Sequence, residues 1–152
     1  MPKVTPFLWF DNDAQDAFAF YNKLFKNSKI ITIQNGPDGK FFTGTIEIEG
    51  QVLHAINGGP HYKLNPAFSL VINCNNQEEV DYYWNALIAD GGEESRCGWC
   101  VDKFGVSWQV IPTLLFELIN NKDRAGAGRA IQSMMQMNKI ECGVLQKAFD
   151  GK

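Results

Sequence analysis

The sequence predicts an α+β fold in which two βαβββ modules form a curved mixed sheet around a concave pocket, followed by C-terminal helices. The first observation is an internal repeat: from Thr5 and again from Phe68, an apolar run leads through Asp or Asn turn residues into an aromatic helix. The second is that the helix positions match at one constant offset, in the pairs Ala17/Val80, Tyr21/Trp84, Asn22/Asn85 and Leu24/Leu87. The third is that the two halves end alike, because segment 50–56 (GQVLHAI) aligns with segment 105–111 (GVSWQVI).

The first module covers residues 1–57. Its continuous apolar run over 4–10 predicts a buried strand. Asn12 or Asp13 then caps a helix whose apolar residues recur at three- and four-residue spacing, namely Ala14, Ala17, Phe18, Tyr21, Leu24 and Phe25. Three strands follow, with turns at Asn35-Gly-Pro-Asp-Gly and Glu49-Gly50; they are expected at 29–34, 41–49 and 51–57. Residues 58–66 concentrate Gly, Pro and Asn and are predicted to be the linker between the modules.

The second module, residues 67–112, repeats this order. Asn76 caps its helix and Asp90-Gly91-Gly92 ends it. The expected strands are 67–74, 93–97, 100–103 and 107–111. Residues 113–152 form a helical C-terminal extension with three apolar stripes, around Leu115, Ile131 and Leu145. These stripes must pack on the modules of the same chain or on a second subunit.

Composition excludes several classes of protein. The 152 residues carry a net charge of −3, which offers no basic surface for nucleic acid. No apolar run approaches the roughly 20 residues that cross a bilayer, and the N-terminus has no apolar core of a secretory signal. The four cysteines do not form a dense disulfide framework, so we expect reduced thiols and a cytoplasmic protein.

The order strand, helix and three strands, given twice, resembles the vicinal-oxygen-chelate superfamily, which includes glyoxalases, bleomycin-resistance proteins and dihydroxybiphenyl dioxygenases. Particular segments are similar to its PhnB-like branch, often labelled 3-demethylubiquinone-9 3-methyltransferase. They are FLWFD from Phe7, HAINGGP from His54, SLVINC from Ser69, CGWCVDKFGVSWQVIP from Cys97 and MMQMNKI from Met134. The resemblance covers nearly the whole chain and implies the fold more firmly than any activity.

Metal enzymes of this superfamily place ligands at four equivalent points, on the first and last strand of each module. On this sequence the repeat assigns those points to Thr5, His54, Phe68 and Gln109. One imidazole, one phenyl ring and two neutral polar side chains do not satisfy a divalent cation, which needs several N or O donors. We therefore predict no cofactor and no tightly bound metal, with a metal-dependent lyase, isomerase or dioxygenase as the alternative.

Alternation of side chains along strands predicts which residues line the pocket. The pocket face should carry Thr5, Phe7, Trp9, Val52, His54, Ile56, Phe68, Leu70, Ile72, Ser107, Gln109 and Ile111. The opposite face should meet the helices through Leu8, Phe10, Leu53, Ala55, Val71, Trp108 and Val110.

His54 and Gln109 are the candidate catalytic residues. A neutral imidazole can serve as a general acid or base, or as a hydrogen-bond anchor for a ligand. The alternative is a structural histidine that Gln109 or Thr5 satisfies. Four aromatic residues, Phe7, Trp9, Phe68 and Trp99, are candidates for the pocket lining, with plain core filling as the alternative. Trp84 and Trp108 are assigned to the core.

The CxxC pair Cys97/Cys100 precedes a strand and not a helix, and no second CxxC follows. Redox chemistry at a helix N-terminus and a zinc ribbon are therefore both disfavoured, and we expect two buried or half-buried thiols flanking a hairpin.

These observations predict a domain that binds a small molecule, either as an enzyme without a tightly bound metal or as a sequestering protein. The methyltransferase label is an alternative, but no glycine-rich loop joins a strand to a helix as in common adenosyl-cofactor sites. A further alternative is an assembly module whose tail helices build a homodimer. The expected partners are a small-molecule ligand and a second copy of the chain, with no nucleic acid and no membrane.

Overall fold

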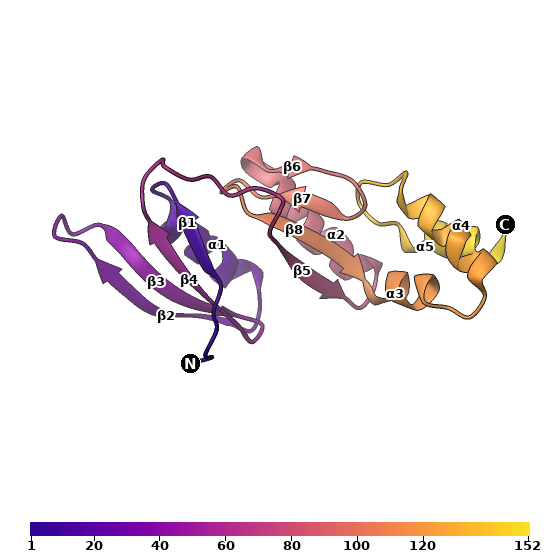
Figure 1. Cartoon of the computed structure of the whole chain (residues 1–152), viewed down its shortest axis with the longest axis horizontal. Coiled ribbons are helices and arrows are strands. Elements are labelled where there is room, and N and C mark those ends of the chain that lie inside the picture. The colour runs from indigo at the N-terminus through magenta and orange to yellow at the C-terminus, as the bar shows by residue number, and fades with distance from the viewer. The chain divides into compact units, whose positions relative to one another are not determined.

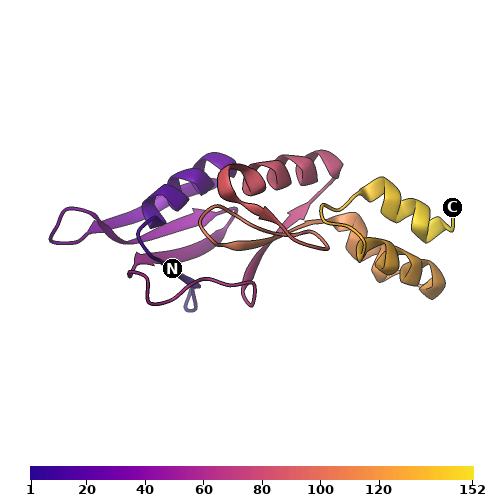
Figure 2. The ribbon, with the colours of Figure 1, turned by 90° about the horizontal axis from the view of Figure 1, so that it is seen from above.

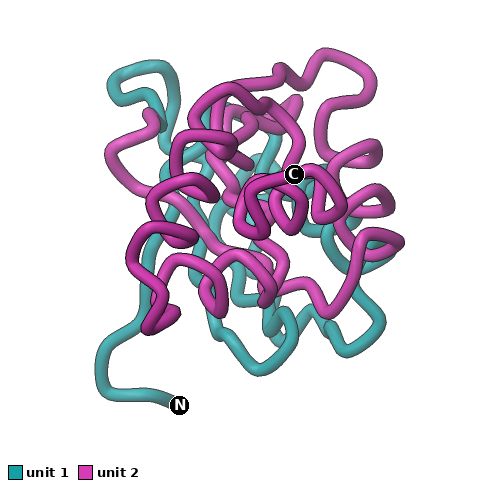
Figure 3. The backbone as a smooth tube through the Cα atoms, turned by 90° about the vertical axis from the view of Figure 1, so that its right-hand side faces the viewer, with its two compact units in different colours: residues 1–64 teal, residues 65–152 magenta.

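The structure, a computed structural model, describes all 152 residues and divides into two compact units, Met1–Leu64 and Asn65–Lys152 (Figure 3). Each unit contains its own four-stranded mixed sheet with one helix between the first and second strands. Three further helices end the chain. The predicted α+β fold of two βαβββ modules with C-terminal helices is confirmed.

Unit 1 has the sheet order β1-β4-β3-β2, in which β1 is parallel to β4 and the other pairs are antiparallel (Figure 1). Its elements are β1 (Phe7–Phe10), α1 (Ala14–Leu24), β2 (Ser28–Asn35), β3 (Phe41–Ile48) and β4 (Gln51–Asn57). The helix lies against one face of this sheet, as Figure 2 shows. Phe18 of α1 is fully buried, and Gly44 of β3 makes room for its ring, because a Cβ at Gly44 would lie 2.9 Å from it.

The start of α1 departs from the expected capping. Of the two predicted cap residues, Asn12 and Asp13, the structure places Asp13 at the N-cap position. Its side chain makes no capping hydrogen bond. Instead Oδ1 of Asn57, at the end of β4, accepts the hydrogen bond from the Ala14 backbone N–H at 2.9 Å. One of the free N–H groups at the helix start is thus satisfied by the last strand of the same unit.

Unit 2 has the corresponding order β5-β8-β7-β6, with β5 parallel to β8. Its elements are β5 (Ser69–Cys74), α2 (Gln77–Ile88), a 3₁₀ turn (Ala89–Gly91), β6 (Glu93–Glu94), β7 (Trp99–Val101) and β8 (Ser107–Pro112). Asn76 caps α2 as predicted, accepting from the Glu79 N–H at 3.0 Å. The predicted stop is also confirmed, since Asp90 and Gly91 adopt positive φ values of 54° and 111°.

The predicted side-chain faces of β5 are wrong by one residue. Leu70 and Ile72 lie in register with Trp108 and Val110, on the buried face that meets α2. Val71, expected on that face, is instead 45% exposed and in register with Gln109. Phe68 precedes β5 and is half-exposed. The predicted faces of β1 and β4 are confirmed, because Leu8 pairs with Ala55 and both are buried.

The side-chain faces of β5 are exchanged because the loop from strand to helix differs in length between the two modules. Three residues, 11–13, separate β1 from α1, whereas only Asn75 and Asn76 separate β5 from α2. The repeat offset is therefore 63 residues between the helices, from Ala17 to Val80, but 64 between the first strands, from Phe7 to Val71. A one-residue slip in a strand exchanges its two faces.

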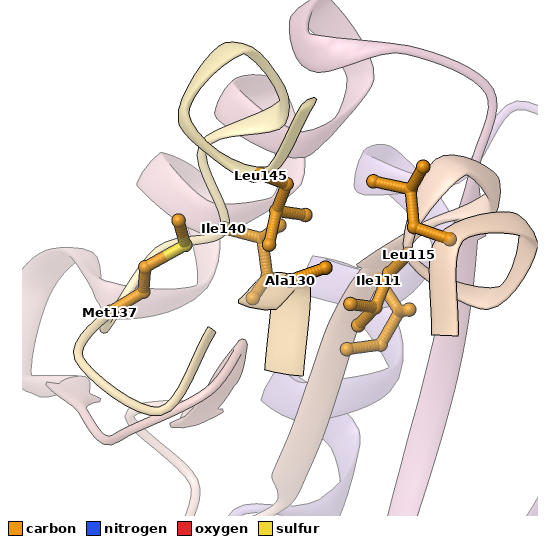
Figure 4. Close-up of a cluster of buried hydrophobic side chains, with 7 residues drawn as sticks. Ile111, Leu115, Ala130, Met137, Ile140 and Leu145 are labelled. Carbon is orange, nitrogen blue, oxygen red and sulfur yellow. The ribbon is translucent and has the colours of Figure 1, made fainter. Parts of the chain in front are cut away.

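The C-terminal helices pack within unit 2, on the same chain. They are α3 (Thr113–Ile119), α4 (Arg124–Met134) and α5 (Cys142–Asp150). Their apolar stripes meet the end of β8 in one buried cluster, drawn in Figure 4: Ile111, Leu115, Leu118, Ala130, Met137, Ile140 and Leu145. None of the helices in the structure combines the length and the apolar composition that crossing a bilayer requires.

Candidate functional site

We call the sheet face opposite the helix the open face of each unit. On the open face of unit 1, β1 and β4 run parallel, with Phe7 opposite His54 and Trp9 opposite Ile56. The rings of Phe7 and His54 have centroids 5.7 Å apart and are tilted by 52°. Phe7 is 58% exposed, so this face presents an uncovered aromatic surface beside an imidazole.

His54 takes its hydrogen-bond partner from the neighbouring strand. Its Nδ1 lies 2.8 Å from Oγ1 of Thr45, which stands opposite it on β3. The partner is therefore neither Gln109 nor Thr5, the two residues that the sequence offered. Thr5 lies just before β1, and its hydroxyl donates to the Pro2 carbonyl at 3.4 Å. The period-2 pattern of residues 41–48 could have indicated Thr45, since it places this hydroxyl on the open face.

Trp9 is fixed by the segment that follows β4. Its Nε1–H donates to the Gly59 carbonyl at 2.9 Å, and the Tyr62 ring meets it edge-on at 5.0 Å. Gly58 allows this packing, because a Cβ there would lie 2.3 Å from the indole. A fixed, half-buried indole on the open face is a suitable wall for a flat apolar ligand.

On the open face of unit 2, Gln109 of β8 lies between Val71 of β5 and Trp99 of β7. Gln109 Nε2 donates to Ser69 Oγ at 2.9 Å, which orients the amide. The sequence reasoning missed Ser69, because the constant repeat offset selected Phe68 at this point. Counting from strand to strand would have found it, since Ser69 stands 64 residues after Thr5.

The structure thus brings Phe7 to His54, and Trp99 to Gln109, each pair within one unit. The roles of Thr5, Phe7, Trp9, His54, Phe68, Trp99 and Gln109 in binding a ligand stay predictions, as does the single pocket.

The turn between β7 and β8, residues 102–106, is held by the side chain of Asp102. Asp102 is buried, and its Oδ1 accepts from the backbone N–H groups of Phe104 and Val106, at 2.9 and 3.0 Å. Its Oδ2 accepts from Trp108 Nε1 at 2.9 Å. The carboxylate therefore holds the turn between β7 and β8 and fixes the buried Trp108, which positions Gln109 next to it on the opposite face.

The thiols are placed as predicted, with Cys97 half-buried and Cys100 buried. Burial raises the pKa of the Cys100 thiol to about 12, with Asp102 and Glu94 adding to the effect. Burial likewise raises the pKa of Cys74 to about 12. Such thiols stay protonated near neutral pH and are poor nucleophiles and metal ligands.

The donor atoms of the open faces do not fit the divalent metal that the resemblance to metal enzymes implies. Nowhere in the 152 residues do three or more His, Cys, Asp or Glu side chains gather where they could hold a metal ion. The side chain of His54 is hydrogen-bonded to the Thr45 hydroxyl, and that of Gln109 to the Ser69 hydroxyl. Neutral hydroxyl and amide groups are weak ligands for a divalent transition metal.

Unit 2 also has a cleft of about 640 Å³ between α2 and the C-terminal tail, residues 113–152. It lies on the α2 side of the sheet, away from the open face. Its lining includes Trp84 and Ile88 of α2, Glu94 of β6, and Lys139 and Val144 of the tail. Lys139 is held by Asp81 at 2.8 Å. None of the predicted site residues lines this cleft.

Comparison with known proteins supports the fold over most of the chain. Residues 2–111 match the model of the family described as 3-demethylubiquinone-9 3-methyltransferase. No curated protein matches the chain. Among solved structures, a PhnB protein from Bacillus cereus with the same description is 29% identical, with a TM-score of 0.68 over 73% of this chain and 99% of its own.

Two more distant structures share the fold. Protein PA1353 from Pseudomonas aeruginosa is 18% identical, with a TM-score of 0.61 over 74% of this chain and 98% of its own. The fosfomycin resistance protein FosX from Listeria monocytogenes, solved with Mn(II) and sulfate, is 17% identical, with a TM-score of 0.54 over 72% of this chain and 92% of its own. The 40-residue tail, residues 113–152, lies entirely beyond the part that the family model matches.

Proposed function

Because the chain belongs to the PhnB-like family described as 3-demethylubiquinone-9 3-methyltransferases, within the vicinal-oxygen-chelate fold, we propose that it binds a small organic molecule on its open sheet faces without a tightly bound metal. One observation carries this proposal. On unit 1 an imidazole nitrogen without a protein partner, Nε2 of His54, lies beside the exposed ring of Phe7. A polar group next to uncovered aromatic surface is typical of a small-molecule site.

The open face of unit 2 supports the same proposal. Gln109 uses one amide hydrogen for Ser69, which leaves its carbonyl oxygen and its second N–H for a ligand. Val71 and Trp99 flank it and contribute apolar surface. His54 and Gln109 are accordingly our candidates for the residues that orient a ligand or act on it.

The residues of this chain do not favour metal-assisted chemistry or methyl transfer by a common adenosyl-cofactor loop. Both loops from first strand to helix lack glycine: they are Asp11-Asn12-Asp13 and Asn75-Asn76. One backbone N–H group at each helix start already has an acceptor, from Asn57 in α1 and from Asn76 in α2. We therefore assign no step to a metal ion or to an adenosyl cofactor.

A thermal-shift screen of small aromatic carbonyl compounds tests the proposal, because a ligand bound only by the folded protein raises its melting temperature. For any compound that binds, His54→Ala should weaken binding by about 1–2 kcal/mol, the value of one lost hydrogen bond. His61→Ala is the matched control, since His61 is exposed and should not affect binding. Equal affinity of the wild-type protein and His54→Ala would make His54 a structural residue.

We also propose a homodimer in a reducing, cytoplasmic setting. The four cysteines are free, which supports a reducing compartment.

The edge strand β2 has unpaired backbone groups on its outer side and exposes Ile31 and Ile33, so it offers a surface for a second copy. Light scattering should give about twice the monomer mass, and Ile33→Lys should restore the monomer. A monomeric wild-type protein would contradict the dimer.

A further inference from the structure

The hydrogen bond between Thr45 and His54 determines which nitrogen of the imidazole carries the proton. Thr45 Oγ1 and His54 Nδ1 lie 2.8 Å apart, on neighbouring antiparallel strands in direct register. The threonine is only 6% exposed, so water does not satisfy its hydroxyl freely. The geometry alone allows either group to donate, because a hydroxyl both donates and accepts.

Burial decides the direction. If Nδ1 carried the proton, the Thr45 hydroxyl hydrogen would need another acceptor, and the structure gives it none. A buried hydroxyl without an acceptor is costly. If the hydroxyl donates to Nδ1, both groups are satisfied, and the proton of the neutral imidazole resides on Nε2. Thr45 is thus a positioning residue for His54.

We infer that His54 presents an Nε2–H donor on the open face, and that its ligand therefore carries an acceptor oxygen attached to an aromatic or other flat apolar group. This inference rests on the proposed function and names the ligand chemistry of the same site. The acceptor follows from Nε2–H. The flat apolar part follows from Phe7, whose exposed ring lies 5.7 Å from the imidazole. Aromatic ketones and aldehydes combine an acceptor oxygen with a flat apolar ring. Aromatic amines instead place N–H donors against the Nε2–H donor of His54.

Nitrogen-15 NMR of the labelled full-length protein tests the tautomer without any ligand. The two histidines are assigned with His61→Gln, which removes the exposed one. At a pH where His54 is neutral, Nε2 should show the shift of a protonated ring nitrogen and Nδ1 that of an unprotonated one. Thr45→Val should move the Nδ1 resonance and admit the other tautomer, and Thr45→Ser should restore the wild-type spectrum. A protonated Nδ1 in the wild-type protein would overturn the inference.

Two probes of similar size then test the ligand chemistry. Acetophenone carries an acceptor oxygen and no donor, whereas aniline carries an amine donor. Acetophenone should shift the Nε2–H resonance and bind about 5- to 10-fold more tightly than aniline, as expected for one hydrogen bond. Equal binding, or tighter binding of aniline, would overturn the inference about the ligand. Failure of both probes with the expected tautomer would count against the proposed function and leave the tautomer established.

Discussion

Replacing Asp102 by Asn should destabilise the protein far more than the change of one atom suggests. In the native structure Oδ1 accepts from Phe104 N–H and Val106 N–H, and Oδ2 accepts from Trp108 Nε1–H. An asparagine can keep the two backbone bonds with its carbonyl oxygen. Its amide NH₂ then faces the indole N–H, so two donors meet in a buried site.

The magnitude follows from the bonds that change. One bond to a charged group, worth about 1.5–3 kcal/mol, is lost, and the two others become neutral and weaker. We therefore expect the free energy of unfolding to fall by about 2–4 kcal/mol. Urea unfolding followed by circular dichroism measures this directly. Asp11→Asn is the matched control: its carboxylate is exposed, and the change should stay within about 0.5 kcal/mol.

A double-mutant cycle with Trp108→Phe isolates the contact, since phenylalanine has no N–H to oppose the amide. Asp102→Asn should cost about 1–2 kcal/mol less in the Trp108→Phe background than in the wild-type protein. If the cost is the same in both backgrounds, or if Asp102→Asn alone changes stability by less than 1 kcal/mol, the buried carboxylate does not hold this turn as described.

Three further predictions concern unit 2. Gly98→Ala should lower the free energy of unfolding in urea more than Gly105→Ala does. Both glycines have φ near +85°, which costs about 1–2 kcal/mol for alanine. Only at Gly98 would the new Cβ also meet side-chain and backbone atoms, the nearest at 2.8 Å. Burial raises the pKa of the Cys74 and Cys100 thiols from 9.0 to about 12, so the unfolded chain loses these protons at a lower pH than the folded protein. The free energy of unfolding should therefore fall as pH rises above 9. Urea unfolding at pH 8 and at pH 10 shows whether the protein is less stable at the higher pH. Gln77→Leu removes the side-chain bonds that join α2 to the start of α5, at 2.7 and 3.0 Å, and should speed amide exchange at that helix start without changing exchange in unit 1.

The sequence allowed the elements to be predicted well, because their signals are local. Apolar stripes at helical spacing placed α1, α2 and all three tail helices, and the Asn76 cap and the stop at Asp90-Gly91 were readable from residue types. Chain topology followed from the repeat. These features depend on neighbours within a few residues, which is the range over which a single sequence is informative.

The candidate site was harder to predict, because it depends on register. The loop between β5 and α2 is one residue shorter than the loop between β1 and α1, and the alignment of the two helices does not reveal this. The shorter loop exchanges the two faces of β5. It also makes Ser69, and not Phe68, the residue equivalent to Thr5. The partner of His54 was missed for a related reason. Thr45 reaches it across a strand pair, and that pairing is fixed by the hairpin between β3 and β4.

The C-terminal tail, residues 113–152, is joined to unit 2 by backbone hydrogen bonds and by apolar packing. The N–H groups of Cys97 and Gly98 donate to the carbonyls of Met137 and Asn138, and Ile111 of β8 is covered by the tail. A shortened protein ending at Pro112, next to the last residue that the family model matches, would leave those amides and that side chain facing water. The second compact unit of this chain therefore extends beyond the part that matches the family model, and residues 113–152 complete it.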